Sequence, residues 1–348
     1  ARVSATSLGL RGAAAIRVLV GDARDANGIP HRGLYADAYG DYDNDIPADC
    51  YYSSLDGDWD ADGDGTYGET TDSPDYYPDL GIGRFCASNA DDVTQSVTKT
   101  LRYTEQPVIG ECDEALMVGE LLWSSPLTYG GTYKNEIRDG SSANGYTTVG
   151  FPATMNVGTL YDQAYSWTKS ELITMLESGM NVVNHLGHCN TTYSMKMTNS
   201  DIPSFDNDGT THSYNFVYSQ GCYCGAFDDR TTSPGTYTDD CFAELFATDD
   251  DGAVATIMNS RYGWGDPGGT DGSSQYFDRE FFDAMFGEGI YSIADANDDS
   301  KVDALWAIDF GANRWCHYEL NVFGDPALHL WTAEPVAMTV SAPDSVYV

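Results

Sequence analysis

The feature that most constrains the fold is a series of short, almost wholly apolar runs separated by segments with helical spacing. The runs occupy residues 15–22, 80–85, 114–121, 146–151, 180–188, 214–222 and 252–260. The helical segments occupy residues 89–106, 131–143, 167–179, 239–248 and 274–286. Strands that are apolar on both faces and alternate with helices are typical of a parallel sheet covered on both sides. The pattern therefore predicts an α/β fold with its chemistry at the carboxyl ends of the strands.

The length of the chain, 348 residues, suits about two domains. We expect two fused subdomains: residues 1–113 form the remainder of an N-terminal unit, and residues 114–334 form a catalytic unit. Residues 35–79, rich in Asp, Tyr and Gly, are expected to form a long ordered loop of the first unit. Residues 335–348 combine Pro with β-branched residues, which is typical of the first strand of a truncated immunoglobulin-like domain.

The charge of the chain narrows the classes of partner. It has 54 acidic and 17 basic residues, a formal net charge of −37. Such a surface repels phosphate, so we expect no binding to nucleic acid or to anionic membranes. No apolar run is long enough to span a bilayer. The acidic excess instead favours hard cations, solubility and basic substrates, with a halophilic surface as the alternative.

Two acidic runs have the spacing of calcium ligands. Residues 58–69, DWDADGDGTYGE, match the calcium-loop template, with a glycine at position 6 and oxygen ligands at positions 1, 3, 5, 7 and 12: Asp58, Asp60, Asp62, Asp64 and Glu69. Residues 295–303 match it less fully, without the acid at position 12, through Asp295, Asn297, Asp299 and Asp303. We expect structural Ca²⁺ in these loops, and the alternative is a solvated acidic turn.

Two of the central runs end in reactive side chains. One ends in His188 and the next in Cys222, 34 positions later, which is enough chain to return to an adjacent strand. Neighbouring strand ends lie about 5 Å apart, so a thiol and an imidazole would face each other, as a nucleophile pair requires. The alternatives are a buried or disulfide-bonded cysteine and a merely hydrogen-bonded histidine. His185, three residues before His188, is expected to face the other side of the sheet and to be structural.

Several segments together resemble one family. The chain resembles the gingipain family of cysteine peptidases, within the caspase-like group, over about residues 15–333. The resemblance implies a mostly parallel, caspase-like sheet in two fused subdomains. The segments that carry it are VLVGD (18–22), LGIGRF (80–85), NVVNHLGH (181–188), YSQGC (218–222), CFAE (241–244) and NVFGDPALHL (321–330).

The resemblance also implies roles for particular residues. Cys222 is the nucleophile, His188 the catalytic imidazole, and Glu120 an acid that orients this imidazole. The backbone N–H groups of Cys222 and Cys189 form the oxyanion hole. Cys189 is a departure, because the family usually has glycine after its histidine. Cys224 is a further departure, either a disulfide partner for Cys189 or Cys241, or a rival nucleophile.

The segment NSRYGWGDPGG (259–269) is expected to bind the substrate side chain. Trp264 resembles the flat wall of the family's pocket for a long P1 residue, and Tyr262 belongs to the same segment. Asp266 lies near the position where lysine-cleaving relatives carry an acid, and a buried carboxylate would pair with Lys or Arg. The alternative is a solvated loop aspartate.

Only about 14 residues precede the first expected strand, whereas family members have another strand and helix there. A missing strand would expose a sheet edge. We therefore expect that the missing strand and helix are cleaved off and stay bound as a second chain, and self-cleavage by a peptidase would explain this.

These observations predict a secreted cysteine endopeptidase that cleaves protein or peptide substrates after Arg or Lys. Ca²⁺ is its only expected cofactor. Two alternatives stay open: a catalytically idle calcium-binding surface or adhesion protein, and a dedicated processing or transpeptidation enzyme.

Overall fold

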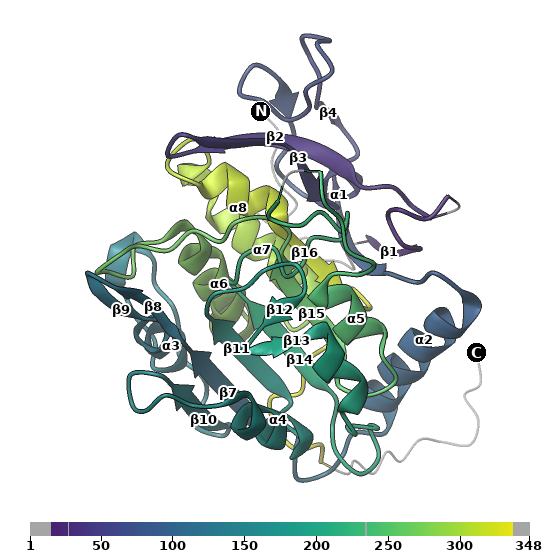
Figure 1. Ribbon diagram of the computed structural model, residues 1–348, viewed down its shortest axis with the longest axis vertical. Helices are drawn as coiled ribbons and strands as arrows, with labels where there is room; N and C mark the ends of the chain where they lie inside the picture. The colour runs from purple at the N-terminus through teal and green to yellow at the C-terminus, as the bar shows by residue number, and fades with distance from the viewer. Residues whose placement is uncertain (1–14, 27, 234, 337–348) are drawn as a thin grey trace, which may run out of the picture.

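The fold is described from a computed structural model, which covers residues 15–26, 28–233 and 235–336 (Figure 1). Its centre is an eight-stranded sheet in the order β1-β6-β16-β15-β14-β11-β7-β10. All pairings are parallel except that of β15 with β16. The strands are β1 (Ala15–Val20), β6 (Leu80–Phe85), β7 (Glu114–Gly119), β10 (Asn156–Tyr161), β11 (Val182–Leu186), β14 (Asn215–Ser219), β15 (Ala253–Asn259) and β16 (Leu320–Phe323).

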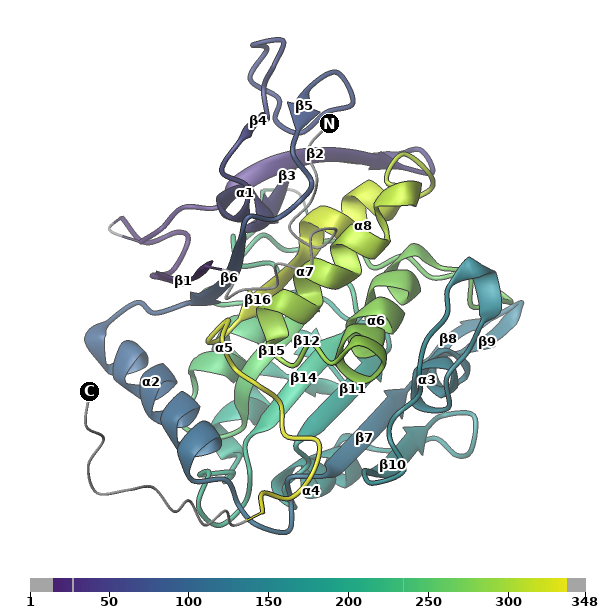
Figure 2. The same ribbon diagram turned by 180° about the vertical axis from the view of Figure 1, so that it is seen from behind.

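Helices cover both faces of this sheet (Figures 1 and 2). Residues alternate between the two cores along β11, where Val182 packs with α6 and α7 and Val183 packs with α4 and α5. The strands are therefore apolar on both sides, as the sequence predicts. The helices are α1 (Cys50–Ser53), α2 (Ala90–Glu105), α3 (Gly130–Arg138), α4 (Lys169–Glu177), α5 (Phe242–Thr248), α6 (Ser273–Asp283), α7 (Ile293–Asp303) and α8 (Asn313–Glu319).

Short elements complete the described part of the chain. A π-helical turn, η4 (Ala284–Glu288), follows α6. Four two-stranded hairpins are β2 (Arg32–Ala38) with β3 (Asp41–Ala48), β4 (Gly57–Asp58) with β5 (Ser73–Pro74), β8 (Leu121–Ser124) with β9 (Leu127–Tyr129), and β12 (Tyr193–Ser194) with β13 (Met197–Thr198). The 3₁₀ turns are η2 (Ala143–Gly145), η3 (Asn199–Ser204) and η5 (Leu305–Ala307).

Two sequence predictions about the fold are wrong. Residues 35–79 are not one long loop, because the β2–β3 hairpin occupies its first part. Arg261 stabilises that hairpin, with Nε 3.0 Å from Asp43 Oδ2 and Nη2 2.6 Å from Asp45 O. Residues 146–151 form no strand, and the edge strand of this side is β10. The carbonyl of Tyr146 instead accepts a 2.9 Å hydrogen bond from the buried Arg279 guanidinium.

The remaining fold predictions concern the ends of the chain and its division. Residues 335–348 lie outside the described residues except Pro335 and Val336, which form no strand. The strands on both sides of residue 113 join in one sheet. Within the described ranges, every helix is too short or too polar to cross a bilayer.

Candidate active site

The register of two central strands brings the predicted nucleophile and imidazole to the same sheet edge. β11 and β14 lie side by side at the centre of the sheet, and His185 pairs with Ser219, an offset of 34 residues (Figure 1). The ladder continues past the strands, because Gln220 N donates to His185 O at 3.1 Å. The same offset separates His188 from Cys222. The two residues therefore follow adjacent strand ends in matching positions.

His188 is exposed and is oriented by a backbone carbonyl. Its Nε2 lies 2.7 Å from the carbonyl oxygen of Leu122 in β8. A carbonyl can only accept a hydrogen bond, so Nε2 carries the proton in the neutral ring. Nδ1 is then left as the basic nitrogen.

Cys222 is half-buried, and its Sγ lies 3.8 Å from Gly263 O. Burial, followed by the charge of the neighbouring Cys189, raises the pKa of the Cys222 thiol to about 12. No hydrogen bond joins Cys222 to His188 in the described part of the chain. The raised pKa favours the neutral thiol over the thiolate.

Two backbone N–H groups at this edge are free to bind an oxyanion. The neighbouring amides are occupied: Gly221 N donates to Ser219 Oγ at 3.2 Å, and Tyr223 N donates to Arg261 O at 2.7 Å. Within the described residues, the amides of Cys189 and Cys222 donate to no acceptor on another residue, and the Cys222 amide interacts only with its own thiol. These two are the donors that the resemblance implies.

The contact made by Glu120 differs from the one that the resemblance implies. Its Oε1 lies 3.2 Å from Nε2 of His185, whose Nδ1 lies 2.8 Å from Ser219 Oγ. His185 thus faces the side of the sheet that carries Glu120 and is fully buried. The orienting contact of His188 is the Leu122 carbonyl, which the sequence could not indicate because every residue has one.

A buried ion pair supports the same strand ends from the other face. Lys134 of α3 and Asp278 of α6 are both fully buried, with Nζ 2.5 Å from Oδ2. Asp278 also accepts hydrogen bonds from Asn184 at 2.6 Å and from Gln220 at 2.6 Å. Sequence analysis missed this group, whose members are distant in the chain.

The three predicted substrate-binding residues lie on one loop after β15, next to Cys222. Trp264 is half-buried between two rings, with centroids 5.4 Å from Tyr39 and 5.6 Å from Trp315. Tyr262 lies edge-on to Tyr223 at 4.9 Å.

Asp266 of this loop is held through its backbone. Its N–H donates to the Tyr133 hydroxyl at 2.7 Å, and that hydroxyl donates to Asp266 O at 2.9 Å. Its carboxylate lies over Gly269, where a Cβ would come 2.1 Å from Oδ2.

Tyr39, at the tip of the β2–β3 hairpin, had no sequence signal that placed it beside this loop.

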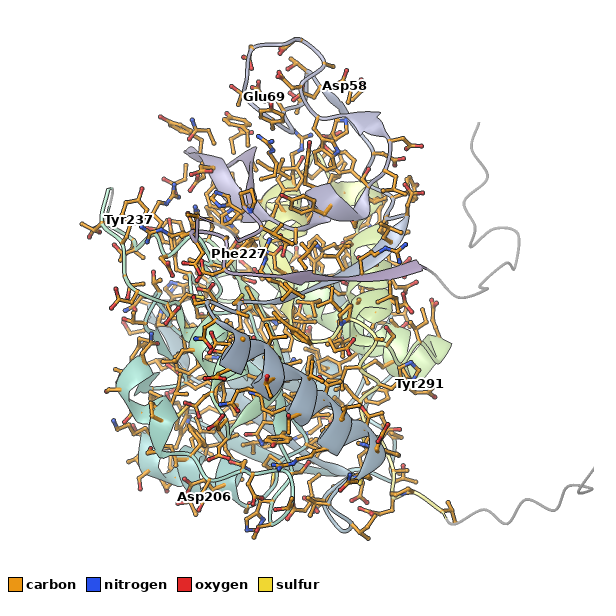
Figure 3. The ribbon with its side chains drawn as sticks, turned by 90° about the vertical axis from the view of Figure 1, so that its right-hand side faces the viewer. Asp58, Glu69, Asp206, Phe227, Tyr237 and Tyr291 are labelled. Carbon is orange, nitrogen blue, oxygen red and sulfur yellow. The ribbon has the colours of Figure 1, made fainter. Side chains whose placement is uncertain are left out.

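The first acidic run is a loop at one end of the molecule, where Figure 3 shows Asp58 and Glu69 far from Asp206. Carboxylate oxygens of Asp60, Asp62 and Asp64 all lie within 4.8 Å of one another. Asp58 and Glu69 are not part of that group. Burial and the surrounding carboxylates, Asp64 first, raise the pKa of Glu69. The charge density is of the kind that a hard cation relieves.

The second acidic run is not a loop, which corrects the prediction for Asp295, Asn297, Asp299 and Asp303. These residues belong to helix α7. Residues two apart on a helix point in different directions, so alternate positions cannot converge on one ion. Asp299 and Asp303 instead lie near Glu288, with ligand atoms within 4.8 Å of one another.

The mostly parallel sheet flanked by helices and the paired strand ends define a caspase-like α/β cysteine peptidase. The chain belongs to peptidase family C25, the gingipain family, whose sequence model matches residues 12–331. No curated protein matches the chain.

Solved structures show the same fold. One is described as the Arg-specific cysteine proteinase gingipain R (RgpB), with 19% identity and a TM-score of 0.69, over 95% of this chain and 68% of that one. Another, a complex of the Porphyromonas gingivalis RgpB pro- and mature domains, has 18% identity and a TM-score of 0.67, over 95% and 69%. A third, described only as a protease, has 19% identity and a TM-score of 0.70, over 98% and 70%.

Proposed function

We propose that this cysteine peptidase is an endopeptidase in which Cys222 attacks the scissile carbonyl and His188 transfers the proton. The observation that carries this proposal is the shared 34-residue offset of the β11–β14 register and of the two side chains. His188 Nδ1 takes the thiol proton as the C–S bond forms. The Cys222 and Cys189 amides bind the resulting oxyanion, and His188 then protonates the leaving amine. Water, deprotonated by His188, releases the acyl group and regenerates the thiol.

The P1 residue in this proposal is Arg or Lys. The loop that contacts Cys222 through Gly263 O also carries Asp266, whose carboxylate would pair with a cationic side chain beside Trp264. The net charge of −37 would attract such substrates. The similar structure described as Arg-specific favours the same class.

The test compares fluorogenic peptides with Arg, Lys, Asn or Asp at P1. Turnover of the Arg or Lys peptide, abolished by Cys222→Ala and by His188→Ala, supports the proposal. Asp266→Asn should lower kcat/KM for the basic peptides by about tenfold or more, as the loss of a charged hydrogen bond does. The control is Asp113→Asn, because Asp113 precedes β7 at the amino end of the strand, away from Cys222. This variant should leave kcat/KM for the basic peptides unchanged. Unchanged turnover in Cys222→Ala would contradict the mechanism, and labelling at Cys222 without turnover would favour an idle relative or a dedicated processing enzyme.

We propose structural Ca²⁺ for the loop of residues 58–69. Asp60, Asp62 and Asp64 supply converging carboxylates, and Gly63 and Gly65, at φ 72° and 87°, allow the loop to turn around them. Ca²⁺ should raise the melting temperature and EDTA should lower it. Asp62→Asn should remove this response, whereas Asp295→Asn in α7 should keep it. A melting temperature unaffected by chelator would contradict the site.

We also propose an extracellular protein with its cleaved N-terminal segment bound as a second chain. β1 is an edge strand of the sheet, and Val18 and Val20 on it are 37% and 43% exposed. A further strand would cover this edge. Mass spectrometry of the purified full-length protein should find two chains for the wild type and one for Cys222→Ala if the cleavage is autocatalytic. A single uncut chain in both would contradict this.

A further inference from the structure

We propose that Glu120, His185 and Ser219 form a buried relay that positions the oxyanion-binding turn at Cys222. The proposal rests on the mechanism above and adds three positioning residues to it. None of the three contacts the expected position of the substrate. They act through the backbone that leads to the reacting groups.

The relay is continuous and closed to solvent. Glu120 Oε1 lies 3.2 Å from His185 Nε2, His185 Nδ1 lies 2.8 Å from Ser219 Oγ, and Ser219 Oγ accepts the Gly221 N–H at 3.2 Å. His185 and Ser219 are fully buried and Glu120 is 5% exposed. The chain of hydrogen bonds thus runs from the residue after β7 through β11 and β14 to the amide immediately before Cys222.

The direction of the hydrogen bonds follows from the groups involved. A carboxylate only accepts, so His185 Nε2 carries a proton, and in the neutral ring Nδ1 is an acceptor. The Ser219 hydroxyl then donates to Nδ1 and keeps its lone pairs for the Gly221 N–H. Glu120 therefore determines the tautomer that makes Ser219 an acceptor for that amide.

Glu120 also supports the strand end that carries His188. A Cβ on Gly187 would come 2.3 Å from Glu120 Cδ, so the carboxyl group lies against the backbone just before the catalytic histidine. At the end of β14, a Cβ on Gly221 would come 2.0 Å from Cys189 Sγ. The glycines before both catalytic residues are thus packed on the same side, and Glu120 and Cys189 fill the space beneath them.

The consequence for catalysis concerns the oxyanion hole. With the Gly221 N–H committed to Ser219, the next amide, that of Cys222, is the one left without an acceptor on another residue in the described part of the chain. Loss of the relay frees the Gly221 amide and lets the turn rotate. The Cys222 amide then no longer points reliably at the developing negative charge.

The test separates oxyanion binding from thiol reactivity. Ser219→Ala and the isosteric Glu120→Gln are compared with wild type in two measurements: turnover of the best fluorogenic peptide, and the rate of Cys222 alkylation by iodoacetamide, which forms no oxyanion. We expect kcat to fall by about tenfold or more at an unchanged KM. The alkylation rate should stay within about twofold.

Ser300→Ala is the matched control. Ser300 is also fully buried, and its hydroxyl donates to Asn297 O at 2.7 Å in α7, away from the strand tips. It should cost similar stability in urea and leave kcat unchanged. An unchanged kcat in Ser219→Ala, or kcat and alkylation falling together, would overturn the relay. If wild-type Cys222 neither alkylates nor supports turnover, the proposed function fails instead.

Discussion

At the scale of single residues, the charge state of Cys222 is the property that most affects its chemistry. Burial raises the pKa of its thiol to about 12, and its Sγ lies 3.8 Å from Gly263 O. A thiol of this kind reacts through the small fraction present as thiolate. In the proposed mechanism His188, oriented by Leu122 O, therefore removes the proton during attack and not beforehand.

This leads to a prediction for the pH dependence of alkylation. Because the raised pKa keeps the thiol protonated, the rate of Cys222 modification by iodoacetamide should rise about tenfold per pH unit through pH 9 without a plateau. Peptide mapping by mass spectrometry follows Cys222 separately from the other cysteines, with Cys222→Ser as the control. A plateau below pH 8 would show a preformed thiolate–imidazolium pair and contradict the neutral resting thiol.

The residues that the sequence could indicate are those whose type carries chemistry at a strand end. His188 and Cys222 terminate two apolar runs, so their placement at one edge follows from strand periodicity and parallel pairing. The Leu122 carbonyl could not be predicted because it is set by the β8 backbone. The histidine partner of Glu120 could not be predicted. The choice between His185 and His188 depends on which face of the sheet each of the two strand ends presents to Glu120.

At the scale of elements, errors arise where tertiary partners override local preference. Residues 146–151 have strand-forming side chains, but the carbonyl of Tyr146 accepts a hydrogen bond from Arg279 and not from a neighbouring strand. β10, with Asn156 and Gly158, has a weak strand signal and forms because it pairs with β7. The sequence of residues 295–303 fits the calcium-loop template, but these residues are helical, and Ser292 is the N-cap of that helix, α7.

The buried ion pair between Lys134 of α3 and Asp278 of α6, which supports the strand ends, gives a prediction at this scale. Lys134→Met should lower the free energy of unfolding by about 3–5 kcal/mol, because it leaves the fully buried Asp278 carboxylate without its counter-ion. The double variant Lys134→Met/Asp278→Asn should lose less than the single one, since the uncompensated charge is gone. Urea denaturation measures both.

The control for the buried Lys134–Asp278 ion pair is an exposed ion pair. Arg138 and Asp139 are joined at 2.7 Å at the surface, so Arg138→Ala should change stability by less than about 1 kcal/mol. A double variant that loses as much stability as Lys134→Met alone would show that the uncompensated Asp278 charge is not the cause and would contradict the prediction.

At the scale of the whole molecule, buried carboxyl groups make stability depend on pH in an unusual direction. Burial, together with nearby carboxylates, raises the pKa of Glu280 to about 8, and burial raises that of Asp298 to about 8. Ordinary values near 4 apply to the unfolded chain. A carboxyl whose pKa is higher in the folded state contributes stability that is complete below about pH 4 and is lost as pH rises through about 8.

The melting temperature in EDTA should therefore be higher at pH 5.5 than at pH 9, and Glu280→Gln and Asp298→Asn should each flatten this decline. The lowered pKa values of Asp201 and Asp208 remove stability only in strongly acidic solution. Burial lowers the pKa of the Lys99 amine to about 7, so this group gains stability as pH rises above 7 and reduces the size of the decline. Calorimetry at high salt separates the buried groups from general repulsion, which salt screens. A decline that salt abolishes would assign the effect to the net charge of −37, and a decline that both variants retain in full would assign it to groups other than these two carboxyls.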